Sequence, residues 1–193
     1  RQNAFDVGEY GIGMLANTAV IDVVAAALEK YRPKHIVLDP VMVSSSGHAL
    51  LDSRAVGRLA ERLLPLATVI TPNIDEAALL LGHGIGDDDE AEAALVGLLA
   101  MGARAVLLKG GHLRGRKVID RLDTGKALYE FEHVRLKISG HGTGCTLASA
   151  IAANLALKKS LPDACEAAGD YVFKALKGAY TPGKSGLSVL NHF

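Results

Sequence analysis

The sequence predicts an α/β fold, built on a mostly parallel central sheet with helices on both faces. Two observations lead to this prediction. Short apolar segments with the length of buried strands alternate with longer segments of helical character. Hydrophobic residues make up 49% of the 193 residues, which is enough for one domain with a sizeable core. We therefore expect a single domain over residues 1–193.

The alternating segments can be assigned in order along the chain. We expect helices at about 18–30, 52–64, 75–81 and 90–101, and strands at 35–39, 68–70 and 105–108. Asn17 and Thr18 are favourable residues for the start of the first helix, and Gly82 for the end of the third. Pro40 and Pro72 stop the strands that precede them.

The pattern changes after residue 111. Two expected strands, at 117–122 and 127–131, flank the sequence Asp123-Thr124-Gly125-Lys126, which is typical of a hairpin turn. Helices are then expected at about 143–158 and 162–178, with Pro162 suited to the first turn of the second helix. The domain therefore combines alternating strands and helices with one β-hairpin near residues 117–131.

Charge and composition exclude several classes of function. Lys+Arg and Asp+Glu are equal at 21 each and no dense basic block occurs, so we expect no nucleic-acid partner. Apolar runs are too short to span a bilayer, so we expect no membrane association. The two cysteines, Cys145 and Cys165, fit a reducing compartment, here the cytoplasm. A formal net charge of zero is compatible with self-association as a homodimer.

The segment His141-Gly142-Thr143-Gly144-Cys145 opens an apolar helical run and is the strongest functional signal. Its glycines let backbone N–H groups approach one anion, which the helix dipole also favours. The N–H groups of Gly142, Thr143 and Gly144 would form an anion hole for a transferred phosphate. The same helix start would lower the pKa of Cys145 and favour a thiolate at neutral pH, and Cys145 would then be the base or the polarising group for an attacking hydroxyl. The alternatives are a tight turn for close helix packing and an inert buried thiol.

Other polar groups follow the predicted strands: Asp39, the pair Asn73 and Glu76, and Lys109 with two glycines. Because the carboxyl ends of parallel strands share one edge of the sheet, these groups are expected at one ligand site. There Lys109 would contact a phosphate and Glu76 would hold a hydrated Mg²⁺. The alternatives are a capping box formed by Asn73 and Glu76, and a lysine that extends to solvent. Met14 is either a core residue or the wall of a pocket for a flat ring, and no cluster has zinc-ligand spacing.

Several segments in order resemble a known family. They are GIGML at 11–15, VLDPVM at 37–42, LL at 50–51, LPLA at 64–67, TPNIDEA at 71–77, LKGGH at 108–112, HGTGCT at 141–146 and NHF at 191–193. Together they resemble the hydroxymethylpyrimidine/phosphomethylpyrimidine kinases of thiamin biosynthesis, within the ribokinase-like superfamily. The resemblance covers nearly the whole chain and implies a ribokinase-like three-layer sandwich.

The resemblance also implies an activity and roles for individual residues. The activity is phosphorylation of 4-amino-5-hydroxymethyl-2-methylpyrimidine, and then of its monophosphate, with ATP and Mg²⁺ as cofactors. Cys145 stands at the catalytic position, where many members of the superfamily have Asp. The other implied roles are phosphate binding at Lys109, an anion hole at Gly142, Thr143 and Gly144, the magnesium environment at Asp39, Asn73 and Glu76, and walls of the pyrimidine pocket at Met14 and Val41.

The chain departs from the family pattern at its start. The Gly-rich first strand and the residues that grip the pyrimidine edge are missing before Arg1, and Gly11 stands where family members usually have Lys. We therefore expect a kinase domain that lacks its N-terminal segment. Two alternatives stay open: a pyridoxal kinase of the type that also carries Gly-Thr-Gly-Cys, and a non-catalytic regulatory domain of the same fold. Retention of Cys145, Lys109 and the acidic residues favours an enzyme.

Overall fold

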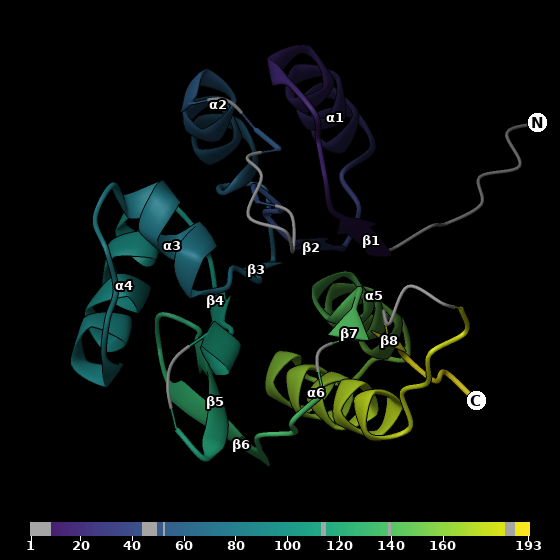
Figure 1. The fold of residues 1–193 in the computed structure, drawn as a ribbon. Helices are drawn as coiled ribbons and strands as arrows, with labels where there is room; N and C mark the ends of the chain where they lie inside the picture. The colour runs from purple at the N-terminus through teal and green to yellow at the C-terminus, as the bar shows by residue number, and fades with distance from the viewer. Residues whose placement is uncertain (1–8, 44–49, 52, 113–114, 139, 184–187) are drawn as a thin grey trace, which may run out of the picture.

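A six-stranded sheet forms the centre of the molecule in the computed structural model (Figure 1). The structure describes residues 9–43, 50–51, 53–112, 115–138, 140–183 and 188–193. The strands lie across the sheet in chain order; β1 to β4 are parallel, whereas β5 and β6 each run antiparallel to the strand before. Their bounds are β1 (Glu9–Ile12), β2 (His35–Leu38), β3 (Val69–Ile70), β4 (Val106–Leu108), β5 (Lys117–Asp123) and β6 (Leu128–Val134).

Helices cover both faces of the sheet, which confirms the predicted α/β class (Figure 1). One face carries α1 (Thr18–Tyr31), α2 (Ser53–Leu63), α3 (Ile74–Leu81) and α4 (Asp88–Ala100). The other face carries α5 (Thr143–Ala156) and α6 (Leu161–Lys177). Near α5, two short strands, β7 (Gly140–His141) and β8 (Ser188–Val189), pair in parallel. None of the helices in the described ranges is long and apolar enough to cross a bilayer.

The buried strands supply both layers of the core because successive side chains point to opposite faces. In β2, Leu38 belongs to the cluster under α1–α4, whereas Val37 belongs to the cluster under α5 and α6. In β4, Leu108 and Leu107 divide between the same two clusters. This division explains why the strands appear in the sequence as continuous apolar runs rather than as alternating ones.

The same alternation directs the polar residues that follow the strands toward α5. Asp39 comes two residues after Val37, Thr71 two after Val69, and Lys109 two after Leu107, so all three fall on the α5 side. The strand pairing also continues beyond the strand ends: the N–H of Asp39 donates to Ile12 O at 2.7 Å, and that of Lys109 to Pro72 O at 2.9 Å. The sheet therefore brings these residues side by side at its carboxyl edge.

Most element boundaries agree with the sequence prediction to within two or three residues. Asn17 caps α1 by accepting the N–H of Val20 at 3.1 Å, and Gly82 ends α3 in the left-handed conformation, with φ 78°. The sequence analysis did not identify β1, β7 or β8 as strands, because these short segments are defined by their partners rather than by an apolar pattern. Residue 52, the expected start of the second helix, lies outside the described residues.

Candidate active site

A buried ion cluster lies at the carboxyl edge of the sheet. Lys109 Nζ is 2.9 Å from Asp39 Oδ1 and 3.7 Å from Glu76 Oε2. Asp39 and Glu76 are only 2% and 3% exposed, and the hydroxyl of Thr71 donates to Asp39 Oδ1 at 3.2 Å. Asp39, Thr71 and Lys109 follow three neighbouring strands, and Glu76 lies in the first turn of α3, so Asp39, Glu76 and Lys109 meet as the sequence predicted. Thr71 was not predicted, although it stands directly before the conspicuous Pro-Asn pair.

The pKa of Lys109 and that of Glu76 depend on burial and on the neighbouring charges. Burial alone would lower the pKa of Lys109, but the charges of Asp39 and Glu76 outweigh it and hold that pKa above its ordinary value. Burial raises the pKa of Glu76, while the attraction of Lys109 opposes that rise. Lys109 therefore remains an ammonium group in this setting and provides a fixed positive charge at the sheet edge.

Asn73 and Glu76 form a capping box at the start of α3. Asn73 Oδ1 accepts the N–H of Glu76, and Glu76 Oε2 accepts the N–H of Asn73, both at 2.8 Å. The alternative interpretation of this pair is therefore correct, and it coexists with the contact from Glu76 to Lys109. The box fixes the Glu76 carboxylate in place, so Asn73 supports it while its own amide oxygen is engaged.

The Gly-rich segment forms the N-terminus of α5 directly above the ion cluster. Gly142 is the N-cap, in the left-handed conformation with φ 84°, and it makes no side-chain cap. A Cβ on Gly144 would lie 3.1 Å from Lys109 Nζ and 3.4 Å from Asp39 Oδ2. The N–H groups of a first helical turn lack intrahelical acceptors, so they and Lys109 present positive charge from two sides. This close approach favours the anion-hole interpretation over a turn made only for packing.

Cys145 is exposed on the first turn of α5, but its ionisation differs from the prediction. Partial burial raises the pKa of its thiol, and Asp39 raises it further by its negative charge and by accepting a hydrogen bond. This direction is opposite to the lowering that the sequence analysis expected from the helix start. Desolvation and Asp39 together outweigh the attraction of Lys109 and a backbone hydrogen bond, which both lower the pKa of this thiol.

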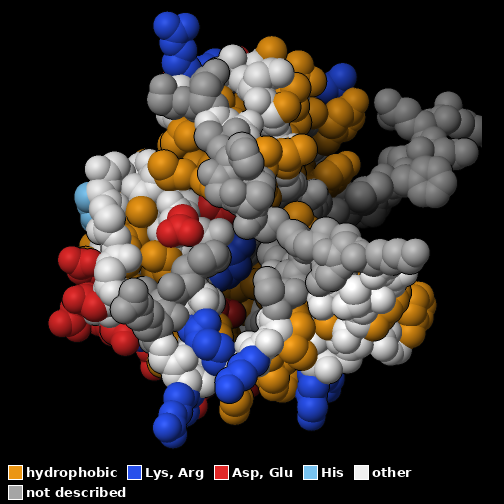
Figure 2. Space-filling view, viewed as in Figure 1, with side chains coloured by type: hydrophobic (Ala, Val, Ile, Leu, Met, Phe, Trp, Pro, Cys, Tyr) orange, Lys and Arg blue, Asp and Glu red, His pale blue; other side chains and the backbone are white. Residues whose placement is uncertain are grey.

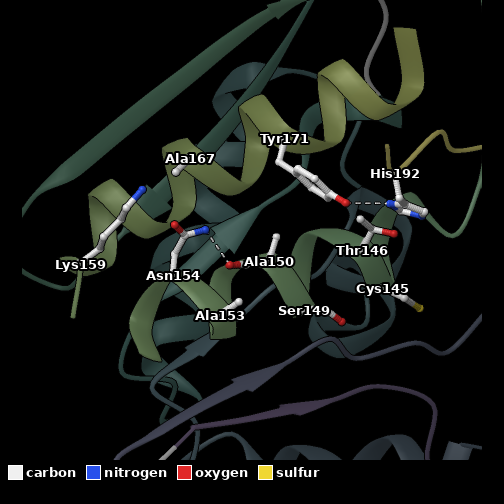
Figure 3. A pocket seen from close by; sticks show the side chains of 10 residues that line it. All are labelled: Cys145, Thr146, Ser149, Ala150, Ala153, Asn154, Lys159, Ala167, Tyr171 and His192. Carbon is white, nitrogen blue, oxygen red and sulfur yellow. Dashed lines mark hydrogen bonds between the residues drawn. The ribbon is translucent and has the colours of Figure 1, made fainter. Parts of the chain in front are cut away.

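The wider surroundings of Cys145 are open. Figure 2 shows acidic and basic side chains meeting near the centre of this face of the molecule. A groove of about 720 Å³ starts at Cys145 and follows α5 to Asn154, with Tyr171 and His192 on its opposite side (Figure 3). Tyr171 and His192 are joined by a 3.0 Å hydrogen bond. Cys145 lines the groove, whereas Lys109, Asp39 and Glu76 do not. Cys145 therefore lies between the groove and the ion cluster.

The two expected walls of the pyrimidine pocket lie after neighbouring strands at this edge. Met14 follows β1 and is 60% exposed, whereas Val41 follows β2 and is partly buried. An exposed methionine is not a core residue, which removes one of the two interpretations of Met14. Among the residues that the structure describes, no group of three or more His, Cys, Asp or Glu side chains could hold a metal ion.

A sequence profile of the family described as phosphomethylpyrimidine kinase matches residues 2–189. The chain belongs to this family. It is 44% identical over 176 residues to the hydroxymethylpyrimidine/phosphomethylpyrimidine kinase of Rhizobium meliloti, covering 90% of this chain and 66% of that protein. It is 40% identical over 186 residues to the kinase of the same name from Escherichia coli, covering 94% and 70%.

Solved structures of pyridoxal and phosphomethylpyrimidine kinases have the same fold as this chain. The chain matches the ADP complex of Bacillus subtilis pyridoxal kinase with a TM-score of 0.87 and 31% identity, covering 94% of this chain and 69% of that one. It matches the phosphomethylpyrimidine kinase of Clostridium difficile with a TM-score of 0.76 and 36% identity, covering 87% and 68%. The ribokinase-like three-layer fold implied by the resemblance is thus confirmed.

The relatives are longer than this chain. The chain spans 66% of the length of the Rhizobium kinase and 37% of the length of a thiamine biosynthesis bifunctional protein of Geobacter sulfurreducens, to which it is 44% identical.

The two cysteines should differ in reactivity. Cys145 is exposed, whereas Cys165 is 2% exposed and burial raises its pKa to about 12, with Asp120 adding to the rise. Iodoacetamide at pH 8 should therefore label only Cys145 in the native protein and both cysteines after denaturation, as peptide mass spectrometry would measure. Because the pKa of Cys145 is also raised, its labelling rate should still increase with pH above neutrality. Equal labelling of the native cysteines would contradict this assignment.

The two glycines after Lys109 should respond differently to substitution. A Cβ on Gly110 would lie 2.0 Å from Ile119 O, whereas a Cβ on Gly111 meets nothing within 4 Å. Gly110→Ala should therefore destabilise the protein by about 1–3 kcal/mol, which lowers the melting temperature by about 2–4 °C per kcal/mol. Gly111→Ala is the matched control and should change the melting temperature little in differential scanning calorimetry. Equal effects of the two substitutions would show that the turn does not pack on β5 as described.

Proposed function

We propose that the protein is an ATP-dependent kinase that phosphorylates 4-amino-5-hydroxymethyl-2-methylpyrimidine, its monophosphate, or both. The observation that carries the proposal is the Lys109–Asp39 pair beneath the Gly-rich start of α5. Membership of the phosphomethylpyrimidine kinase family supports the same reaction class. Phosphoryl transfer requires positioning and charge stabilisation more than covalent chemistry, and this arrangement offers both.

We place the phosphates of ATP beside Lys109 and the first turn of α5. The Lys109 ammonium provides a point charge, and the N–H groups of Gly142, Thr143 and Gly144 provide donors for the transferred phosphoryl group. Use of ATP is supported by related solved structures, since a Staphylococcus aureus pyridoxal kinase, 29% identical, was solved with AMP-PCP. In this role Lys109 exchanges part of its contact with Asp39 for contact with phosphate.

Asp39 and Glu76, with Asn73 in support, fit a hydrated magnesium ion. Both are buried carboxylates that already share one cation, Lys109 Nζ, at 2.9 and 3.7 Å. When bound, Mg²⁺ neutralises the charge that develops on the phosphate oxygens. Two carboxylates are sufficient for this ion, which keeps several waters and takes its remaining ligands from phosphates.

Cys145 lies where the hydroxyl group of the substrate would approach the phosphate. Its thiol is exposed at the start of α5, close enough to Asp39 for that carboxylate to raise its pKa, and it can contact an alcohol at the sheet edge. We assign Cys145 to orienting this hydroxyl while the new O–P bond forms and the bond from phosphorus to ADP breaks. The thiolate form of Cys145 would take up the hydroxyl proton; because its pKa is raised, Cys145 must first lose its own proton for this step. In this proposal Met14 and Val41, which follow the adjacent strands β1 and β2, form two walls around the pyrimidine ring.

The substrate itself is assigned by relatedness. Identity is 36–44% to the pyrimidine kinases compared above and 29–31% to the pyridoxal kinases. The backbone match to the pyridoxal kinase is, however, the higher one, with a TM-score of 0.87 against 0.76. We therefore keep pyridoxal as the second candidate substrate.

We also propose that the protein is cytoplasmic and that it forms a homodimer. Analytical ultracentrifugation would measure its oligomeric state.

The activity test is ADP release in the presence of ATP, Mg²⁺ and the pyrimidine alcohol, with pyridoxal assayed in parallel. Cys145→Ala should lower kcat about 10²-fold or more while leaving ATP binding largely intact. Cys165→Ala, which removes the other thiol at a buried position in α6, is the matched control and should keep wild-type turnover. Wild-type turnover in Cys145→Ala would remove this residue from the mechanism. Binding of alcohol and ATP without ADP release by the wild-type protein would favour a regulatory domain instead.

Lys109→Met should mainly weaken nucleotide binding. Loss of a charged contact to phosphate is expected to raise the KM for ATP about tenfold or more, while the KM for the alcohol changes little. Lys126, on the exposed hairpin turn, provides the control substitution Lys126→Met, which should leave both constants unchanged. An unaltered ATP dependence in Lys109→Met would contradict the role of Lys109.

A further inference from the structure

The turn formed by Lys109, Gly110 and Gly111 is tied to the β5–β6 hairpin. The N–H of Gly110 donates to Asp120 Oδ1 at 2.8 Å. On the next residue, Arg135 Nη1 donates to Gly111 O at 2.7 Å, and its Nε donates to Gly115 O at 2.8 Å. Two charged side chains of the hairpin therefore hold the backbone that carries Lys109. Neither of them was identified as a site residue from the sequence.

Asp120 lies next to Lys109 across the sheet. Leu108 pairs with Arg121 in the antiparallel register of β4 and β5, which places Asp120 opposite Lys109. Both side chains fall on the α5–α6 side, since Asp120 comes two residues before Leu122 of that core cluster. The backbones of the turn and of β5 are also in close contact, because a Cβ added to Gly110 would lie 2.0 Å from Ile119 O.

The charge of Asp120 is compensated mainly by the turn itself. Burial raises the pKa of Asp120, and three contacts oppose that rise: the hydrogen bond from Gly110 N–H and the charges of Lys109 and His133. The charge of Asp120 also adds to the raised pKa of Cys165 on α6. A partly buried carboxylate is costly unless its partners stay in place, so it couples the position of the turn to that of the hairpin.

We propose that Asp120 is a positioning residue for the nucleotide phosphates, acting through the Gly110 N–H to hold Lys109 over the site. The inference rests on the proposed role of Lys109 in phosphate binding. Asp120 itself lies below the turn and is not placed against the substrate. Its removal frees the Lys109–Gly110 peptide to rotate, and the ammonium group then loses its alignment with the first turn of α5.

The same strand provides a matched control. Asp123 also lies on β5 and also accepts a glycine N–H, that of Gly125, at 2.7 Å. This bond lies within the hairpin turn Asp123-Thr124-Gly125-Lys126, at the other end of β5 from the Lys109 turn. Asp123→Ala therefore removes the same kind of hydrogen bond without touching the Lys109 turn.

The experiment compares Asp120→Ala, Asp120→Asn and Asp123→Ala with the wild-type protein. Binding of AMP-PCP is measured by calorimetry, kcat and KM for ATP by ADP release, and amide hydrogen exchange at Gly110 by NMR. We expect Asp120→Ala to raise the Kd for AMP-PCP and the KM for ATP about tenfold, with a smaller change in kcat. Asp120→Asn keeps an acceptor oxygen but loses the charge, so it should bind AMP-PCP more weakly than the wild type and more tightly than Asp120→Ala. Asp123→Ala should bind as the wild type does.

The outcomes separate this proposal from a purely structural role and from the proposed function. If Asp120→Ala lowers the melting temperature but keeps wild-type nucleotide binding, Asp120 serves stability alone and the proposal is overturned. Should Asp120→Ala fail to fold, weaker binding in Asp120→Asn than in Asp123→Ala supports the proposal and equal binding overturns it. If the wild-type protein binds no nucleotide, the proposed function fails. In that case faster exchange at Gly110 in Asp120→Asn or Asp120→Ala than in Asp123→Ala still supports positioning, and unchanged exchange overturns it.

Discussion

The buried contact between Lys109 and Asp39 is the interaction around which the rest of the site is arranged. Taking both charges out of water is costly, and replacing such a pair by apolar residues is often neutral or stabilising. Removing one partner, in contrast, leaves an uncompensated charge and costs about 3–5 kcal/mol. The pair is therefore poorly explained as a source of stability. The pair fits the proposed function better, in which the Lys109 ammonium group binds the negative charge of a phosphate.

The surrounding structure holds this pair from several directions. The extended strand pairing fixes the backbone of Asp39 and Lys109, the capping box of α3 fixes Glu76, and Gly144 lets α5 come within contact distance. The β5–β6 hairpin holds the turn after Lys109 from below. These contacts come from segments far apart in sequence, so the site exists only when both layers of helices are packed on the sheet.

Much of this arrangement could be predicted from the sequence because the signals are local. Asn17, Gly82 and the Asn73–Glu76 spacing determine helix ends through hydrogen bonds within a few residues, and the apolar runs predict buried strands. The rule that parallel strands share a carboxyl edge then brought Asp39, Glu76 and Lys109 together. The balance of burial and charge at Cys145 and the contact of Asp120 with Gly110 could not be predicted, because both depend on close distances between segments far apart in sequence. The short strands β7 and β8 are likewise defined only by each other.

The two-residue spacing between Val37 and Asp39, and between Leu107 and Lys109, has a consequence for how the sequence can change length. Insertion or deletion of a single residue within β2 or β4 would turn the charged group to the opposite face, into the apolar layer beneath α1–α4. Changes of length at the exposed β5–β6 turn carry no such penalty, because they leave the parity of these strands intact. Variation in chain length is therefore expected to concentrate in the loops, while the strand segments that end in Asp39 and Lys109 keep a fixed number of residues.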